Sequence, residues 1–492
     1  MSSSRPPPQA KYELLGEHAR TTSNTKRAAA AAVLIIAILG ITVITIYLSW
    51  NGINAVGRAS FLHLADHQNN DNVMTQIHQK RLEQYGRAFM MMENNNSSVT
   101  EYLTVSNVTV NKSTKDTENA TPMLVCYYSF PGADDLTPEA IDPNLCTHII
   151  IASMSVVNKS LSLLHPAKSK VVKQVVALKA YNSALKVMIC VGGYSGPGGF
   201  NDMVATHETR KQFIKEILSL AKEYSLDGID LDWEFPAWQG AAMERVHFSL
   251  LLKEIREELN KKKLQLLLSV AVAAPRPVID VAYDVPELAQ YLDFINLMAY
   301  DYHFYVPYLP TTGANAPLYS RPDEKGYFRT LNTNWSAFYW MEKGMPKNKI
   351  VVGVPTYGHS FRLMNPANHG WSAPAIGFGS LGSGGFVSYR QVCAFLAQPG
   401  TNYQFDKRSK VPYAFNGREW VSYDDNRSVS YKAEYIVNND YAGAMVFSLN
   451  QDDYEGICTS KTFRLTRQLK IILMDDQLFQ MEKSLSIALG IH

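Results

Sequence analysis

The stretch Asp227-Gly-Ile-Asp230-Leu-Asp232-Trp-Glu234-Phe-Pro236 lies near the middle of the 492-residue chain. Side chains alternate between the two faces of a strand, so Asp230, Asp232 and Glu234 would share one face. The other face is apolar, with Ile229, Leu231, Trp233 and Phe235. Neighbouring carboxylates repel one another, and the simplest interpretation is an edge strand whose acids lie in water. The sequence around the stretch favours a different one.

Short apolar runs of strand length recur on both sides of this stretch. In chain order they are Leu124–Phe130, His148–Ser153, Val187–Val191, Gly228–Glu234, Leu266–Ala271, Phe294–Tyr300, Ile350–Pro355 and Ala444–Leu449. Most intervals hold a helix-like segment, such as Glu208–Tyr224 and Met243–Lys262. Eight strands that alternate with helices predict an α/β fold, the (β/α)8 TIM barrel. A doubly wound open sheet is the competing architecture.

One interval is too long for an ordinary barrel connection. Residues 356–443 hold a Gly-rich and Tyr-rich stretch between the last two runs. We expect a small α+β domain at 359–423, inserted between strands seven and eight. The barrel would then comprise residues 121–358 and 424–475, followed by a C-terminal tail at 476–492.

In a barrel, the acidic face of this strand would be buried and not exposed to water. The fourth strand would point its carboxylates into the lumen and pack its apolar face against helices. Crowded buried carboxyl groups share protons, which raises the pKa of some of them. A carboxyl group that stays protonated can donate to a leaving group. Glu234 would be nearest the carboxyl-terminal mouth, where barrel enzymes carry out their chemistry, so we predict it as the catalytic acid.

The sequence resembles a known family, the family 18 glycoside hydrolases, which include chitinases and chitinase-like lectins. The acidic stretch matches the family motif Asp-X-X-Asp-X-Asp-X-Glu in full. Other matches follow in the right order: Gly192-Gly193, Met298-Ala-Tyr300-Asp301, Val354-Pro-Thr-Tyr357-Gly358, Tyr423-Asp424-Asp425, Gly443-Ala-Met445-Val446 and Asp452-Asp453. The resemblance runs from about Leu124 to Cys458.

The resemblance implies hydrolysis of β-1,4 bonds between N-acetylglucosamine units of chitin or chitooligosaccharides, without a cofactor or a metal. In this family the acetamido group of the substrate replaces an enzyme nucleophile. Glu234 would protonate the leaving oxygen, Asp232 would orient the acetamido group, and Asp230 would tune the charge of Asp232. Tyr300 would hydrogen-bond the acetamido oxygen. The expected substrate-binding residues are Asp227, Gly193, Tyr194, Met298, Asp301, Tyr357 and Phe447.

Several positions depart from the family pattern. Phe447 and Tyr194 replace Trp, Ser153 replaces Phe, His359 replaces Arg, and Cys190 replaces a small Ser or Ala. These changes thin out the aromatic strip that stacks on sugars, which argues against long crystalline chitin as the substrate. Two alternatives stay open: a lectin without turnover, and an endo-β-N-acetylglucosaminidase acting on N-glycans. Lectin relatives typically lose Glu234 or Asp232, and this chain keeps both.

The five cysteines fit an oxidising compartment that allows two disulfides and one free thiol. Their spacing does not determine the pairing. The resemblance implies the pairs Cys126–Cys146 and Cys393–Cys458, with Cys190 left as a buried thiol.

The N-terminal region departs from the globular pattern. Residues 28–54 contain no charged side chain, and a helix of about 20 residues spans a bilayer. We expect a signal-anchor helix at 28–50, because a cleaved signal peptide would not follow 27 mostly polar residues. Lys26 and Arg27 precede the span, so residues 1–27 would form a cytoplasmic tail. The chain would be a single-pass type II membrane protein.

Residues 51–120 are rich in Asn, Ser and Thr and would form a glycosylated stalk. Asn-X-Ser/Thr sequons occur at Asn95, Asn96, Asn107, Asn111, Asn119, Asn158, Asn334 and Asn426, and none precedes the predicted span. The formal net charge of +2, without a long basic block, gives no sign of a nucleic-acid partner. The sequence leaves the oligomeric state open.

The predicted topology can be tested on the chain expressed in animal cells. Residues 51–492 should carry N-glycans and lie outside the cell or in a sealed lumen. Enzymatic removal of N-glycans should then increase the electrophoretic mobility of the protein. A chain whose mobility does not change after this treatment would contradict the topology.

Overall fold

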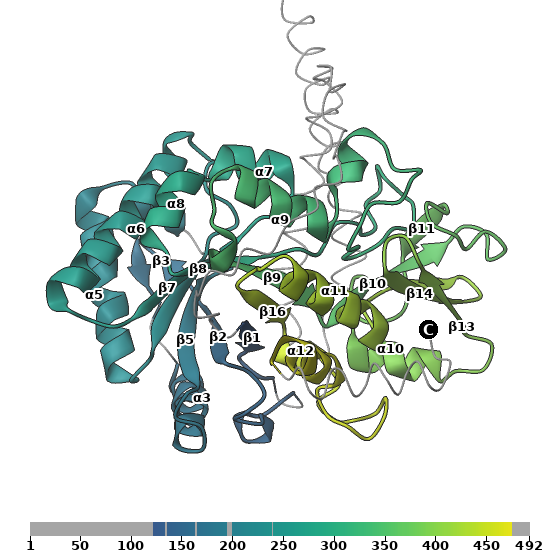
Figure 1. Cartoon of the computed structure of the whole chain (residues 1–492), viewed down its shortest axis with the longest axis horizontal. Helices are drawn as coiled ribbons and strands as arrows, with labels where there is room; N and C mark the ends of the chain where they lie inside the picture. The colour runs from purple at the N-terminus through teal and green to yellow at the C-terminus, as the bar shows by residue number, and fades with distance from the viewer. Residues whose placement is uncertain (1–121, 133–134, 163–164, 194–198, 239, 475–492) are drawn as a thin grey trace, which may run out of the picture. The chain divides into compact units, whose positions relative to one another are not determined.

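The computed structural model describes residues 122–474 except 133–134, 163–164, 194–198 and 239 (Figure 1). The described residues belong to one compact unit. The expected tail, signal-anchor helix and stalk, residues 476–492 and Tyr194 lie outside them. Within the described ranges, no helix is long and apolar enough to cross a membrane.

Eight parallel strands close into a barrel (Figure 1). They are β1 (Met123–Ser129), β2 (His148–Met154), β5 (Lys186–Gly192), β6 (Gly228–Asp232), β7 (Leu267–Val272), β8 (Phe294–Leu297), β9 (Ile350–Pro355) and β16 (Gly443–Phe447). Each strand pairs with the next in this order, and β16 pairs with β1 to complete the ring. The predicted barrel is therefore confirmed, and the open sheet is excluded.

Three of the predicted strands are longer than the observed ones, because they continue past the observed ends at the carboxyl-terminal mouth. The eighth strand ends at Phe447 and not at Leu449. The fourth strand ends at Asp232 and not at Glu234, and the sixth ends at Leu297 and not at Tyr300. After Met298 the backbone amides turn to local acceptors, since Tyr300 N donates to the carbonyl of Met298 at 2.9 Å. The chain thus leaves the sheet where the predicted site residues begin.

Helices surround the barrel (Figure 1). The α-helices outside the insertion are α3 (Pro166–Ala177), α4 (Phe200–Val204), α5 (His207–Glu223), α6 (Met243–Lys262), α7 (Arg276–Ala282), α8 (Val285–Tyr291), α9 (Thr333–Glu342), α11 (Asn426–Asn438) and α12 (Arg464–Met474). Local sequence sets their ends: α5 begins at a capping box, in which the Thr206 hydroxyl accepts from the backbone amide of Thr209. The buried Phe213 and Ile217 lie one turn apart on its inner face.

Short elements fill the connections between strands. The 3-10 helices are η1 (Pro138–Ala140), η2 (Leu178–Ala180), η3 (Gly326–Thr330), η4 (Lys347–Lys349) and η5 (Leu449–Gln451). A two-stranded hairpin of β3 (Val156–Val157) and β4 (Ser160–Leu161) follows β2.

A second, six-stranded sheet is formed by residues between β9 and β16. Its elements are β10 (Tyr357–Leu363), β11 (Ala375–Phe378), β12 (Phe386–Ser388), α10 (Tyr389–Leu396), β13 (Asn402–Asp406), β14 (Val411–Asn416) and β15 (Glu419–Ser422). Its strands pair in antiparallel fashion, with β10 between β11 and β15 and also paired with β12. Because β10 begins directly after the end of β9, this sheet can bring side chains to the mouth of the barrel.

Both expected disulfides are present. Cys126 of β1 is bonded to Cys146, with their Cα atoms 6.2 Å apart. Cys393 of α10 is bonded to Cys458, with a Cα separation of 5.4 Å, and this bond connects the inserted segment to the chain after β16. Cys190 is a buried free cysteine, as predicted.

The strands β5 and β6 lie close together at Gly192. This residue has a φ of +150°, and a Cβ atom there would overlap the backbone carbonyl of Asp232. The amide of the next residue, Gly193, donates to the same carbonyl at 2.9 Å. The absence of a side chain at Gly192 therefore sets the position of Asp232.

Replacing Gly192 with Ala should force β5 away from β6 and strain the backbone at a positive φ. We expect a loss of about 2 kcal/mol or more in the free energy of unfolding, measured by denaturant titration. Gly377→Ala is the matched control, because a Cβ at Gly377 would meet nothing within 4 Å. Equal stability of the two variants would contradict the close approach.

Candidate active site

The acidic residues of β6 run from the centre of the barrel towards its mouth. Asp230 is fully buried and Asp232 is 7% exposed. Glu234 lies two residues beyond the end of the strand and is partly exposed. The three carboxyl groups therefore experience different environments, with the predicted acid nearest to solvent.

The carboxylate of Asp230 is hydrogen-bonded to three other barrel strands. The Tyr127 hydroxyl of β1 donates to Oδ2 at 2.6 Å, and the Ser269 hydroxyl of β7 donates to Oδ1 at 2.6 Å. The side-chain amide of Asn296 on β8 also donates to Oδ1, at 3.1 Å. Burial raises the pKa of Asp230, while the donors, led by Ser269 and Tyr127, oppose this rise by stabilising the ionised form.

The sequence interpretation missed these donors. Ser269 and Asn296 are single polar residues inside apolar runs, and that signal could have identified them as groups pointing into the lumen. Cys190 lies directly opposite Asp230 in the β5–β6 register. Burial, and next the charge of Asp230, raise the pKa of the Cys190 thiol, so it stays protonated.

Aromatic rings gather at the mouth around Phe447, the last residue of β16. The ring of Tyr300 stacks on Phe447, with centroids 5.8 Å apart and planes 29° apart. The ring centroid of Tyr127 lies 5.6 Å from that of Phe447, and the ring centroid of Tyr357 lies 5.9 Å from that of Tyr300. The structure thus brings Tyr300, Tyr357 and Phe447 together. Tyr127 connects this group to the acidic strand, because its ring contacts Phe447 and its hydroxyl donates to Asp230.

Asp301 connects the barrel to the second sheet. Its Oδ1 atom accepts from the Tyr357 hydroxyl at 2.6 Å and from His359 Nε2 at 2.8 Å, both on β10. Its backbone amide donates to Asn315 Oδ1 at 3.0 Å. Asp301 is buried and has a φ of +60°, so these contacts hold it in a backbone conformation that few non-glycine residues adopt.

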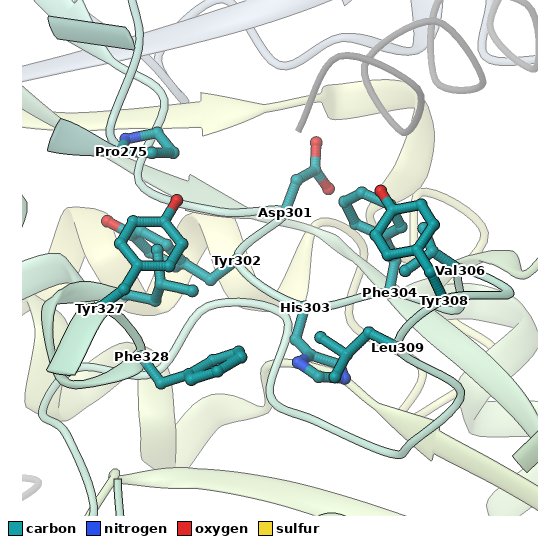
Figure 2. Close-up of a pocket in the computed structure, with 11 residues that line it drawn as sticks. Pro275, Asp301, Tyr302, His303, Phe304, Val306, Tyr308, Leu309, Tyr327 and Phe328 are labelled. Carbon is teal, nitrogen blue, oxygen red and sulfur yellow. The ribbon is translucent and has the colours of Figure 1, made fainter. Parts of the chain in front are cut away.

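A small cavity lies beside Asp301 (Figure 2). Tyr302, Tyr327 and Phe328 lie on one side of it, and Phe304, Val306 and Tyr308 lie on the other. Most of the remaining lining is apolar, with Pro275, Leu309 and Leu331, while His303 adds an imidazole. Aromatic rings next to one buried carboxylate form a surface that can stack on a sugar ring and hydrogen-bond its polar groups.

The other predicted site residues have different outcomes. Met298 is buried just beyond β8, and its amide donates to the Val272 carbonyl at 3.0 Å. Gly193 contacts Asp232 through the backbone, as described above. Within the described ranges, no group of three or more His, Cys, Asp or Glu side chains could hold a metal ion.

The assignment of Asp227 to substrate binding needs correction. Asp227 precedes β6 and lies at the amino-terminal end of the strand, opposite to the mouth. Its Oδ2 atom accepts from the backbone amide of Val187 and from Lys179 Nζ, both at 2.8 Å. Its carboxylate therefore joins β5 to β6 at their base. The motif spacing identified the residue but not the end of the barrel at which it lies.

The family model of the glycosyl hydrolases family 18 matches residues 123–452. The chain belongs to this family. Mouse chitotriosidase-1 is 38% identical over 345 residues, which cover 68% of this chain and 73% of that protein. Human chitinase-3-like protein 2 is 36% identical over 363 residues, which cover 70% of this chain and 91% of that protein.

Solved structures of similar proteins also match the fold and the sequence of this chain. The group IV chitinase of Ostrinia furnacalis in complex with allosamidin is 34% identical, with a TM-score of 0.68 over 72% of this chain and 98% of that one. Human YKL-39, described as a pseudo-chitinase with retained chitooligosaccharide binding properties, is 35% identical, with a TM-score of 0.68 over 72% of this chain and 99% of that one. The family therefore includes both chitinases and proteins that bind chitooligosaccharides without being chitinases.

The hydrogen bond from Tyr127 to Asp230 can be tested by Tyr127→Phe. The loss of one donor should raise the pKa of Asp230 further and, for the hydrolysis expected from the sequence, lower kcat/KM on chitooligosaccharides by about tenfold. Tyr128→Phe is the control, because the Tyr128 hydroxyl donates to the Leu136 carbonyl at 2.7 Å, away from the acidic strand. If both variants lose activity equally, the Tyr127 hydroxyl has no special role in the site.

Proposed function

We propose that this chain hydrolyses β-1,4 linkages between N-acetylglucosamine units in chitin or chitooligosaccharides. The observation that carries the proposal is the order of Asp230, Asp232 and Glu234, from the buried centre of the barrel to its mouth. Membership in a family that contains chitinases supports the same reaction. We further infer a retaining mechanism, in which the substrate supplies the nucleophile.

In the first step, the carbonyl oxygen of the substrate's 2-acetamido group attacks its own anomeric carbon. Glu234 donates a proton to the glycosidic oxygen, the bond between that oxygen and the anomeric carbon breaks, and the leaving sugar departs with the proton. Asp232 orients the acetamido N–H and stabilises the positive charge of the oxazolinium-like intermediate. Tyr300 directs its hydroxyl to the acetamido oxygen.

In the second step, the Glu234 carboxylate removes a proton from water, and the resulting hydroxide attacks the anomeric carbon. The intermediate ring opens and restores the acetamido group. Two inversions at one carbon leave the product in the β configuration. Glu234 is protonated again, so the cycle needs no other acid or base and no cofactor.

The rings around the site support recognition of a sugar chain. Phe447 would face the reacting sugar, and Asp301 and Tyr357 would hold its polar groups. The cavity beside Asp301, with Phe304 and Tyr308 on one wall, would receive a neighbouring sugar. Aromatic contacts are worth roughly 0.5–1.5 kcal/mol each beyond buried area, so a Phe in place of a Trp at 447 would weaken binding only modestly.

Oligosaccharide binding without turnover is the second candidate function. The similarity to human YKL-39, described as a pseudo-chitinase with retained chitooligosaccharide binding properties, supports it. The presence of all three carboxyl groups in this chain favours catalysis, because a protein that only binds oligosaccharides needs no proton donor.

We also propose that residues 28–50 anchor the protein in a membrane, with the catalytic part extracellular or in the secretory lumen. The support is the uncharged segment, the Lys26-Arg27 pair before it and the sequons after it. The two disulfides agree with an oxidising compartment.

Glu234→Gln tests the reaction. The amide has nearly the same shape but no acidic proton, so kcat/KM on fluorogenic chitobiose and chitotriose substrates should fall by about 100-fold or more, while oligosaccharide binding remains. Glu223→Gln, an exposed position on α5, serves as the control. A Glu234→Gln variant with near wild-type rates would refute the assignment of the acid. A wild-type chain that binds chitotriose without cleaving it would favour the second candidate.

A further inference from the structure

The chain just before Glu234 is held by two aromatic contacts of Trp233. Trp233 is buried and stacks on Phe200 of α4, with centroids 5.3 Å apart and planes 7° apart. It also makes an edge contact with Phe248 of α6, with ring centroids 5.7 Å apart and planes 83° apart. Together with the pairing of β6, this fixes the chain immediately before Glu234.

On the other side of Glu234 the chain has left the sheet, and a carboxylate holds it instead. Glu244, in the first turn of α6, is 7% exposed. Its Oε2 atom accepts from the backbone amide of Ala237 at 2.9 Å, and Oε1 accepts from the amide of Ala241 at 3.2 Å. The side-chain amide of Asn201 on α4 donates to Oε1 at 2.6 Å.

These hydrogen bonds hold a tight and strained segment. Ala237 has a φ of +58°, a conformation that costs free energy for any residue with a side chain. A Cβ atom on Gly240 would overlap the Glu244 carboxylate, so the chain wraps closely around it. Loss of these hydrogen bonds would destabilise both the buried Glu244 carboxylate and the N–H groups that donate to it, because buried polar groups are unstable without hydrogen-bond partners. The contacts are therefore stronger than bonds between neutral groups.

We propose that Glu244 is a positioning residue for Glu234. Ala237 follows Glu234 by three residues, so the Glu244 carboxylate determines where the backbone of the catalytic acid lies after β6 ends. The same two helices, α4 and α6, fix both flanks of Glu234: Phe200 and Phe248 fix Trp233, while Asn201 and Glu244 fix the following turn. This role rests on the proposed hydrolysis.

The role predicts a specific kinetic effect. A proton donor displaced by about 1 Å can lose on the order of 100-fold in rate, whereas substrate contacts made by other strands stay in place. A substitution that removes the hydrogen bonds accepted by Glu244 should therefore lower kcat and leave KM nearly unchanged. A purely structural role would lower thermal stability without changing kcat per folded molecule.

Glu244→Gln in the full chain is the test. The amide is isosteric, but in either orientation its NH2 group faces an N–H donor, Ala237 on one side or Asn201 and Ala241 on the other. We expect kcat on a fluorogenic chitotriose substrate to fall by about tenfold, with KM within about twofold of wild type. Glu257→Gln on the same helix is the control, because Glu257 is 63% exposed and should leave both constants unchanged.

The outcomes separate this role from the proposed function. Absence of turnover by the wild-type chain overturns the hydrolysis and this role with it. Wild-type turnover with an unchanged kcat in Glu244→Gln overturns the positioning role alone, and so does a loss that disappears when rates are normalised to the folded fraction. If Glu244→Gln does not fold, Asn201→Ala removes one donor and keeps the carboxylate. Its kcat should fall by about twofold to threefold, and an unchanged kcat overturns the role.

Discussion

The buried carboxylate of Asp230 is the constraint on which the rest of the site depends. A carboxyl group at the centre of a barrel is unstable unless donors surround it, and here they come from β1, β7 and β8. These strands are far apart in sequence and meet only when the barrel closes. Closure of the barrel and the hydrogen bonding of Asp230 are thus coupled, and Asp232 takes its position from the same strand.

The mouth of the barrel is built from chain that has left the sheet. Glu234, Tyr300 and Asp301 all lie beyond the last paired residue of their strands. Such residues cannot rely on strand pairing, so other groups hold them. Asp301 is held by Tyr357 and His359 of β10, and the turn after Glu234 is held by Glu244 of α6. The second sheet and the outer helices therefore contribute to the geometry of the site as well as covering the barrel.

Much of the fold could be predicted from the length and spacing of apolar runs, because a buried parallel strand is apolar on both faces. The prediction failed at the strand ends, where apolar residues such as Ala299 follow the last hydrogen bond between β8 and β7. It also misplaced Asp227, whose carboxylate caps the base of β5 instead of facing the mouth. A motif orders residues along one strand, but hydrogen-bond partners on other elements decide what each residue does.

The sequence by itself determined the barrel, the two disulfide pairs through family resemblance, and the alternation that puts Asp230 and Asp232 on one face of β6. The barrel and the alternation follow from local periodicity and from motifs within one strand. The tertiary structure alone decided which groups surround those acids. Tyr127, Ser269 and Asn296 reach Asp230, and Glu244 reaches Ala237, because closing the ring and packing α6 on α4 bring distant residues within hydrogen-bonding distance. No pattern within one element encodes such a contact, because its free energy depends on both partners being buried together.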